Sequence, residues 1–395
     1  GPVVISLPED ILSLLSDANP SSKINIIEPS VSEEVVLNIK EKLLKSKKPV
    51  FIVGGTCWNT EGITQFNSFI ENNNFPVISS FRRQDIFNNH SSSYAGVCSF
   101  INTPKLNDAL NEADLIFAFN TLLGDITTSN YNLWLNQIET RVVIQSHSSL
   151  LEIGKVYQVD LAINSGPNYL ASKLNNLGKI GDWSSHTSLL RSDYIKGLEI
   201  KEQPGQVDMG KIIYYLQDKL PEDAILTNGA GNFSTWSNLL FKFGKKARLL
   251  APTSGAMGFG LPAAIAAKIT NPNRTVICFA GDGDFQMNMA ELGTALHYKA
   301  FPVILLLNNS SYGTIRMHQE KSYPDRVYGT DIENPDYSMI AKAYGIPSYQ
   351  VNKTEEFQQF FDKVIKSEKG ALIEIILDIQ SISPHKTLNE IKMKT

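Results

Sequence analysis

The sequence contains no uninterrupted run of about 18 apolar residues and no excess of positive charge. Without such a run, we expect no membrane-spanning helix and no membrane partner. The net charge of −4 and the isoelectric point near 5.9 argue against nucleic acid as the main partner. Cysteine is scarce, and Cys57, Cys98 and Cys278 lack metal-ligand spacing. This pattern predicts no disulfide framework and a cytoplasmic location.

Two common phosphate-binding fingerprints are also missing after the apolar run at residues 276–279. A dinucleotide site would need G-x-G-x-x-G between a strand and a helix, and a P-loop would need G-x-x-x-x-G-K-[ST]. Neither pattern follows this run, so an oxidoreductase of the NAD type fits the sequence poorly.

What the sequence does contain is an alternation of strand and helix patterns over a length that suits two domains. Its 395 residues, 42% hydrophobic and 19% charged, are typical of a globular protein with more than one core. The alternation predicts an α/β fold with two doubly wound parallel-sheet domains, the first of them Rossmann-like. We place these domains at residues 20–178 and 209–395, with an interdomain linker at 179–208.

The expected elements follow from the periodicity of the apolar residues. In the first domain we expect helices at 33–46 and 60–73 and strands at 49–53, 76–80, 115–119, 142–145 and 160–164. In the second domain we expect helices at 209–220, 232–243, 259–269, 336–344 and 355–366 and strands at 224–227, 276–279, 303–307 and 371–377.

The most informative segment joins two of these strands. Gly281, Asp282 and Gly283 follow one apolar strand, and Asn309 follows the next, with a helical pattern between them. Such strands should be parallel neighbours, which brings Asp282 and Asn309 to the sheet edge where α/β folds bind ligands. A carboxylate and an amide oxygen suit Mg²⁺, and the glycines let the backbone approach a phosphate. The segment therefore predicts a Mg²⁺–diphosphate site.

Gly-Asp-Gly alone is also an ordinary turn, but with Asn308 and Asn309 after the next strand it resembles the thiamine diphosphate motif. Residues 227–233, 252–264 and 312–320 are similar to further segments of the acetolactate synthase-like enzymes, which use this cofactor. The resemblance implies that the chain holds the middle domain and the C-terminal, diphosphate-binding domain of that family. Thiamine diphosphate and Mg²⁺ are the expected cofactors.

The resemblance also assigns roles to individual positions. Asp282 and Asn309 would bind Mg²⁺ together with the backbone carbonyl of Ser311. Met257 would be the apolar wedge that bends the cofactor into a V, and the carbonyl of Gly255 would accept a hydrogen bond from its 4′-amino group. The cofactor-binding residues expected on these grounds are Asn228, Gly229, Ala230, Gly231, Asn232, Gly255, Ala256, Met257, Gly281, Asp282, Gly283, Asp284, Asn309, Ser311, Tyr312, Gly313 and Thr314.

Two positions have more than one interpretation. Asp284 stands where relatives often carry Ser, and its carboxylate would repel a diphosphate unless it faces away or caps the following helix; we expect the cap. His318 stands where many biosynthetic acetolactate synthases carry Trp. It is either a substrate contact or proton donor, or a surface histidine. We take Met257, His318 and Gln319 as candidate catalytic residues.

Residues 1–19 are similar to the family's exit from its pyrimidine-binding domain, so we interpret them as a linker. The resemblance then implies that an N-terminal domain of roughly 150 residues is missing, and with it the Glu that activates the cofactor. No residue of this sequence can take that role. Because the family's sites form across a dimer interface, a homodimer or homotetramer with a shared site is expected.

The resemblance raises the question of FAD, which the middle domain of acetolactate synthases binds at a Gly-rich turn and an Arg-containing acidic segment. Gly54 and Gly55 keep the turn, but residues 117–125 contain neither the Arg nor the acidic pair. We therefore expect that FAD does not bind and that this domain acts as a scaffold.

The resulting prediction is a thiamine diphosphate- and Mg²⁺-dependent transferase or lyase that decarboxylates and ligates 2-oxo acids, with pyruvate as the expected donor. Two alternatives stay open. One is a non-oxidative 2-oxo-acid decarboxylase, which would use the same residues. The other is a non-catalytic cofactor-binding fragment that needs the missing domain for activity. We expect the isolated chain to be inactive because the activating Glu is absent.

Overall fold

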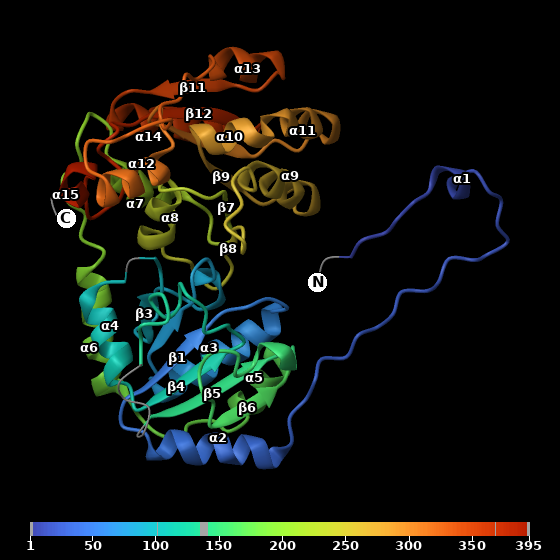
Figure 1. Ribbon diagram of the computed structural model, residues 1–395, viewed down its shortest axis with the longest axis vertical. Helices are drawn as coiled ribbons and strands as arrows, with labels where there is room; N and C mark the ends of the chain where they lie inside the picture. Colours follow the sequence, from blue (N-terminus) through green and yellow to red (C-terminus); the bar gives the residue numbers. More distant parts are fainter. Residues whose placement is uncertain (1–2, 101, 135–140, 368, 393–395) are drawn as a thin grey trace.

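The computed structural model describes residues 3–100, 102–134, 141–367 and 369–392. These residues form two six-stranded sheets in which every strand pairing is parallel, and helices cover both sheets (Figure 1). No helix in the described ranges is long and apolar enough to cross a membrane. The predicted fold class is confirmed.

The first sheet has the strand order β3-β2-β1-β4-β5-β6. The chain builds outward from β1 to β3 and then restarts at β4, so the topological switch lies between β1 and β4. The strands are β1 (Pro49–Val53), β2 (Val77–Ser79), β3 (Tyr94–Val97), β4 (Leu115–Phe119), β5 (Val142–His147) and β6 (Leu161–Asn164). The accompanying helices are α2 (Glu33–Lys45), α3 (Thr60–Asn73), α4 (Pro104–Glu112) and α5 (Pro167–Asn175), with the short η3 (Leu150–Glu152).

The second sheet has the order β11-β12-β10-β9-β7-β8, and its switch lies between β7 and β9. Its strands are β7 (Ile225–Asn228), β8 (Arg248–Leu250), β9 (Val276–Gly281), β10 (Val303–Asn308), β11 (Ser348–Val351) and β12 (Ala371–Ile376). Its helices are α7 (Met209–Lys219), α8 (Ser234–Leu240), α9 (Gly260–Thr270), α10 (Asp282–Asn288), η4 (Met289–Glu291), α11 (Leu292–Tyr298), α12 (Gly313–Ser322), α13 (Tyr337–Ala343), α14 (Thr354–Ser367) and α15 (Leu388–Lys392).

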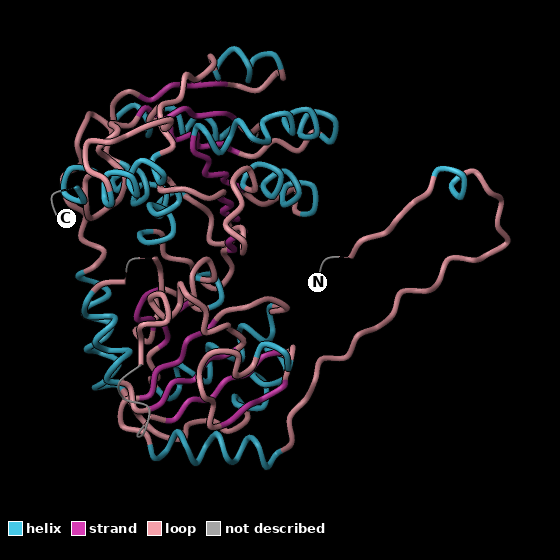
Figure 2. Tube along the Cα trace, viewed as in Figure 1, coloured by secondary structure: helices cyan, strands magenta, loops and turns pink. Residues whose placement is uncertain are grey.

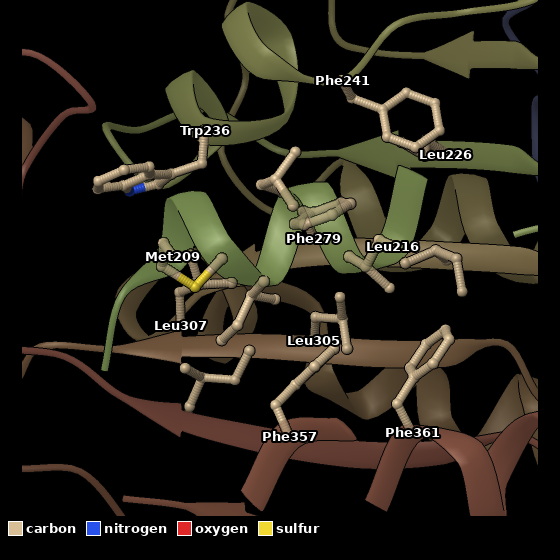
Figure 3. Packing of buried hydrophobic residues seen from close by; sticks show 14 of the residues in the cluster. Met209, Leu216, Leu226, Trp236, Phe241, Phe279, Leu305, Leu307, Phe357 and Phe361 are labelled. Carbon is tan, nitrogen blue, oxygen red and sulfur yellow. The ribbon is translucent and has the colours of Figure 1, made fainter. Parts of the chain in front are cut away.

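Alternate residues of the central strands enter different cores, because successive side chains of a strand point to opposite faces. In β9, Phe279 joins a cluster with residues of α7 and α14, whereas Cys278 joins a cluster with residues of α9 and α11. Figure 3 shows the first cluster, where Phe279 of β9 lies in the same core as Phe357 and Phe361 of α14. A strand buried on both faces is apolar throughout, which is why the sequence pattern identified it.

The sequence analysis did not find the edge strands β3, β8 and β11, or the helix α6 (Ser184–Lys196) within the predicted linker. α6 packs on β3, where the rings of Tyr94 and Tyr194 meet edge to face at 5.1 Å between centroids. The buried residues of α6 are Thr187 and Leu190. The helix therefore lacks the repeating apolar face from which sequence patterns identify helices.

The two domains contact each other through the loop 81–91, which contains η1 (Gln84–Ile86). The N–H of Asn89 donates to the carbonyl of Phe243 at 2.8 Å, and the N–H of Phe243 donates to Asn89 Oδ1 at 2.9 Å. Gln84 Nε2 donates to the carbonyl of Asn238 at 2.9 Å. These residues are buried, so the groups that form these bonds find their partners in the other domain.

Residues 3–27 extend away from both sheets (Figures 1 and 2). They are exposed, and α1 (Glu9–Leu12) is the only helix or strand within them. The predicted linker at residues 1–19 falls largely in this segment, although residues 1–2 lie outside the described residues.

Candidate functional site

The carboxyl ends of β9 and β10 lie side by side at one edge of the second sheet. The two strands pair in parallel, with Gly281 opposite Leu307. Asp282 and Asn309 follow these strand ends, so they come to the same edge of the sheet, next to the switch between β7 and β9. The predicted neighbour relation of the two strands is therefore confirmed.

A pocket lies at this edge, formed by the loops after β7, β9 and β10 and by the start of α12. The predicted site residues that line it are Ala230, Gly231, Asn232, Met257, Gly281, Asp282, Gly283, Asp284, Asn309, Ser311, Tyr312, Gly313 and Thr314. Lining residues that the sequence analysis did not select are Phe233, Trp236, Leu307, Ile315, Leu377, Ser381 and Ile382. The predicted site residues that do not line it are Asn228, Gly229, Gly255, Ala256, His318 and Gln319.

Two of the candidate catalytic residues lie on α12 away from the pocket lining. His318 is exposed. Gln319 Nε2 donates to the carbonyl of Tyr328 at 3.0 Å, and its Oε1 accepts from the N–H of Tyr328 at 3.1 Å. Gln319 therefore holds the loop after α12, and the catalytic role of both residues stays a prediction.

Asp282 is a buried carboxylate, 3% exposed, with no basic partner among the described residues. Its Oδ1 accepts from the N–H of Gly283 at 3.0 Å, and its Oδ2 accepts from Asn334 Nδ2 at 2.9 Å. Burial raises the pKa of this carboxyl group. Because a buried charge without a counter-charge is costly, the site favours a bound cation.

Asn334, which precedes α13, orients this carboxylate, and the sequence analysis missed it. Its Nδ2 donates to Asp282 Oδ2 and to Asn308 Oδ1, each at 2.9 Å. The Tyr337 hydroxyl donates to Asn334 Oδ1 at 2.9 Å, and Glu374 Oε1 accepts from Asn308 Nδ2 at 2.7 Å. Two sequence signals were available: the Asn-Pro turn that Asn334 opens and the acidic Glu374 within an apolar strand.

Asp284 does not cap α10, so the capping prediction was wrong. Its Oδ1 accepts from the N–H groups of Ala230 at 3.1 Å and Gly258 at 2.9 Å, linking the loop after β7 to the segment before α9. The Asp284 carboxylate therefore bonds to these N–H groups and not to the first N–H groups of α10. Gly229 lies against it, because a Cβ there would be 1.9 Å from Asp284 Oδ1. Burial raises the pKa of Asp284 to about 6.

Asn309 and Ser311 supply neutral oxygens beside Asp282. Asn309 Oδ1 accepts from the N–H of Ser311 at 3.2 Å, and the Ser311 carbonyl accepts from the N–H of Gly313 at 2.8 Å. Each oxygen keeps a second lone pair, so the set fits Mg²⁺, which prefers hard oxygen ligands. No group of three or more His, Cys, Asp or Glu side chains in the described ranges could hold a metal ion. A divalent ion here would therefore depend on these neutral oxygens.

The pocket wall is fixed by contacts between its loops. Thr314 Oγ1 accepts from the N–H of Asn232 at 2.9 Å and donates to Asn232 Oδ1 at 2.8 Å. A Cβ on Gly283 would lie 2.5 Å from the ring of Tyr312, so only glycine allows this approach. The start of α12 thus lies against the loop after β7, and its backbone N–H groups favour an anion such as a diphosphate.

The corresponding crevice of the first sheet is filled by its own side chains. At the switch between β1 and β4, Asn120 Nδ2 donates to the carbonyls of Gly54 at 3.3 Å and Thr56 at 2.8 Å. A Cβ on Gly54 would lie 2.0 Å from Ser80 Oγ, and one on Gly55 would lie 2.0 Å from the Asn120 carbonyl oxygen. These glycines accommodate protein atoms, so the residues do not fit FAD. The absence of FAD binding stays a prediction.

Comparison with protein families identifies both domains. Residues 36–174 match the central domain of the thiamine pyrophosphate enzymes, and residues 229–375 match their C-terminal, thiamine pyrophosphate-binding domain. The first matched range contains the whole first sheet, and the second contains β8 to β11, most of β12 and most of the residues that line the pocket. The chain belongs to the thiamine pyrophosphate enzymes.

Relatives of the chain within this class include large subunits of acetolactate synthase. The chain is 26% identical over 381 residues to the isozyme 2 large subunit of Escherichia coli K12, covering 96% of this chain and 68% of the relative. It is 29% identical over 389 residues to the large subunit of Lactococcus lactis, covering 95% and 66%. The predicted resemblance is thereby confirmed. The chain spans about two thirds of the length of these relatives.

Proposed function

We propose that this chain holds the cofactor-binding part of a thiamine diphosphate- and Mg²⁺-dependent enzyme that decarboxylates and ligates 2-oxo acids, with pyruvate as the donor. One observation carries the proposal: the buried Asp282 carboxylate lacks a basic partner among the described residues and lies beside Asn309 at the edge of the second sheet. The large-subunit relatives support the carboligase assignment.

In this proposal the chain's own residues bind and orient the cofactor. Asp282, Asn309 and the Ser311 carbonyl would hold Mg²⁺, and backbone near Gly283 and residues 229–232 would hold the diphosphate. Met257 lines the pocket and supplies an apolar surface for the bent cofactor. When bound, thiamine diphosphate supplies the electron sink that allows a 2-oxo acid to lose carbon dioxide. The apolar lining residues exclude water from that reaction.

Two alternatives remain as outcomes to be tested. A simple 2-oxo-acid decarboxylase would use the same residues and would differ in its product. A non-catalytic cofactor-binding fragment would bind thiamine diphosphate without turnover. In all three cases we propose a homo-oligomer that shares its sites across an interface.

Calorimetric titration of thiamine diphosphate, with and without Mg²⁺, tests the cofactor site. We expect Mg²⁺-dependent binding that is lost in Asp282→Ala and kept in Asp218→Ala, a change of an exposed carboxylate on α7. Absence of binding by the wild-type chain, or equal binding by Asp282→Ala, would contradict the proposal. Because we expect the isolated chain to be inactive, pyruvate turnover is measured after a pyrimidine-binding domain of the family has been added. Acetolactate then indicates a ligase, acetaldehyde a decarboxylase, and no product a non-catalytic cofactor-binding fragment.

A further inference from the structure

Arg82 is an unusual residue at the contact between the two domains. It is 7% exposed, and its φ of +63° lies in the left-handed region that residues other than glycine rarely adopt. Its Nε has no hydrogen-bond partner in the described structure. Burial lowers the pKa of Arg82, and no neighbouring charge contributes to that shift. A strained backbone and an uncompensated buried cation are both unfavourable, which makes the contacts that Arg82 does form informative.

The contact that Arg82 makes across the domain boundary is with the backbone of Pro252. Arg82 Nη1 donates to the Pro252 carbonyl. The same carbonyl accepts from the N–H of Gly255 at 3.1 Å, which closes the turn at the start of residues 252–258. The guanidinium carbon of Arg82 lies 4.7 Å from the ring centre of Phe81. This cation–π contact within the central domain also holds the side chain in place. Arg82 therefore fixes one end of this segment from the central domain.

The other end of residues 252–258 is anchored within the C-terminal domain. The N–H of Gly258 donates to Asp284 Oδ1 at 2.9 Å, and its carbonyl accepts from Asn288 Nδ2 at 2.9 Å. Between the two anchors, residues 253–256 are exposed, and Met257 lines the pocket. The segment that carries Met257 is thus held at two points, one from each domain.

We propose that Arg82 is a positioning residue for the cofactor site, and that it holds residues 252–258 so that Met257 faces the bound cofactor. The central domain then contributes a positioning residue to the thiamine diphosphate site, in addition to the scaffold role predicted for it. The identity of the ligand rests on the proposed function, whereas the anchoring of the segment rests on the contacts alone.

Three variants of the full 395-residue chain test this role by thiamine diphosphate titration in saturating Mg²⁺. Arg82→Met removes the donor and keeps an unbranched apolar stem, and Arg82→Lys restores a cationic donor. Gln84→Met is the matched control, because it removes the bond to Asn238 at the same domain contact without touching Pro252. We expect the Kd to rise roughly tenfold in Arg82→Met, the usual effect of losing one charge-assisted hydrogen bond. The rise should be partly reversed in Arg82→Lys and absent in Gln84→Met.

Equal Kd values for wild type and Arg82→Met, or the same rise in Gln84→Met, would overturn the proposal. Amide hydrogen exchange without cofactor keeps this test separate from the proposed function. We expect the peptide covering residues 253–258 to exchange at least several times faster in Arg82→Met than in wild type and Gln84→Met, with the remaining peptides unchanged. If the wild-type chain binds no thiamine diphosphate, the proposed function fails. The exchange result alone then tests whether Arg82 anchors residues 252–258. Unchanged exchange in Arg82→Met would overturn that anchoring.

Discussion

The two sheets reverse their building order at equivalent places, between β1 and β4 in the first and between β7 and β9 in the second, yet their crevices differ. In the first sheet Asn120 fills the crevice and bonds to the carbonyls of Gly54 and Thr56. In the second sheet the loops around Asp282 leave a pocket. The two crevices differ in the partners that their polar groups have. Those of the first crevice satisfy one another, whereas the carboxylate of the second has no counter-charge among the described residues.

This comparison shows that a topological switch provides a place for a ligand but does not by itself create a site. Glycines occur at both crevices. At Gly54 the missing side chain makes room for Ser80, and at Gly283 it makes room for Tyr312 of the pocket wall. What distinguishes the second crevice is a buried charge that protein groups leave uncompensated.

The largest effect that we expect concerns pH and Asp284. Its pKa is raised from 3.8 to about 6, so between these values the folded chain keeps a proton that the unfolded chain has lost. The contribution of Asp284 to the free energy of unfolding should therefore be largest below about pH 4 and fall by on the order of 2–3 kcal/mol as the pH rises to about 6. Urea unfolding at several pH values without Mg²⁺ measures this fall.

Asp284→Asn is the control for this fall, since Asn keeps an oxygen that can accept from Ala230 and Gly258 but does not titrate. The stability advantage of the variant over wild type should grow with pH across that window. This difference isolates Asp284 from Asp282 and Asp85, whose pKa values burial also raises. Parallel pH curves for the two proteins would show that Asp284 has an ordinary pKa.

A matched pair of glycine substitutions compares the two crevices directly. Gly54→Ala and Gly229→Ala would each place a Cβ within about 2 Å of a side-chain oxygen, on Ser80 and Asp284 respectively, and each should cost about 2 kcal/mol of stability. Only Gly229→Ala should also weaken thiamine diphosphate binding. Chemical denaturation and calorimetry measure both effects. Equal loss of cofactor affinity in the two variants would remove the distinction between the crevices.

Asn334, which orients the Asp282 carboxylate, should have a smaller effect. Asn334→Ala removes the donor to Asp282 Oδ2 and Asn308 Oδ1, and removal of such supporting bonds typically weakens metal binding roughly ten- to a hundredfold. Mg²⁺ titration of cofactor binding measures the loss. Asn352→Ala, on the exposed surface after β11, serves as the control. Unchanged Mg²⁺ dependence in Asn334→Ala would mean that Asp282 needs no such support.

The smallest expected effect belongs to the first domain alone. The Asn59 side chain caps α3 by accepting from the N–H of Gly62 at 2.7 Å, and Asn59→Ala should cost about 1 kcal/mol of stability. Thiamine diphosphate affinity should not change, because the Asn59 side chain and backbone bond to Gly62 and Asn168 of the first domain and not to the pocket. Thermal unfolding and calorimetry on one sample measure both quantities. A loss of thiamine diphosphate affinity in Asn59→Ala would contradict the difference that we infer between the two domains.

The sequence was sufficient to predict the central strands, because apolar runs such as β9 and β10 are buried on both faces. Asp282 and Asn309 were found because each follows one of these strands. The edge strand β8 was missed because it is three residues long. Asn334 was missed because it lies 52 residues after Asp282 in a separate loop. No repeating sequence pattern links residues that are so far apart.

The partners of Asp284 and Arg82 depend on tertiary contacts that sequence patterns do not contain. The N–H groups bound by Asp284 lie 54 and 26 residues earlier in the chain. The partner of Arg82 lies 170 residues later. Helix capping involves residues that are close in sequence. Asp284 instead accepts hydrogen bonds from the distant N–H groups of Ala230 and Gly258, which a local rule does not predict.

The reciprocal bonds between Asn89 and Phe243 constrain how this chain can be recombined with its relatives. A chimaera whose breakpoint lies between α6 and α7 would join a foreign loop 81–91 to the native residues around Phe243. Buried amide and carbonyl groups on both sides would then lose their partners. Functional hybrids should therefore exchange the loop 81–91 and residues 238–252 together, although about 150 residues of sequence separate these two segments.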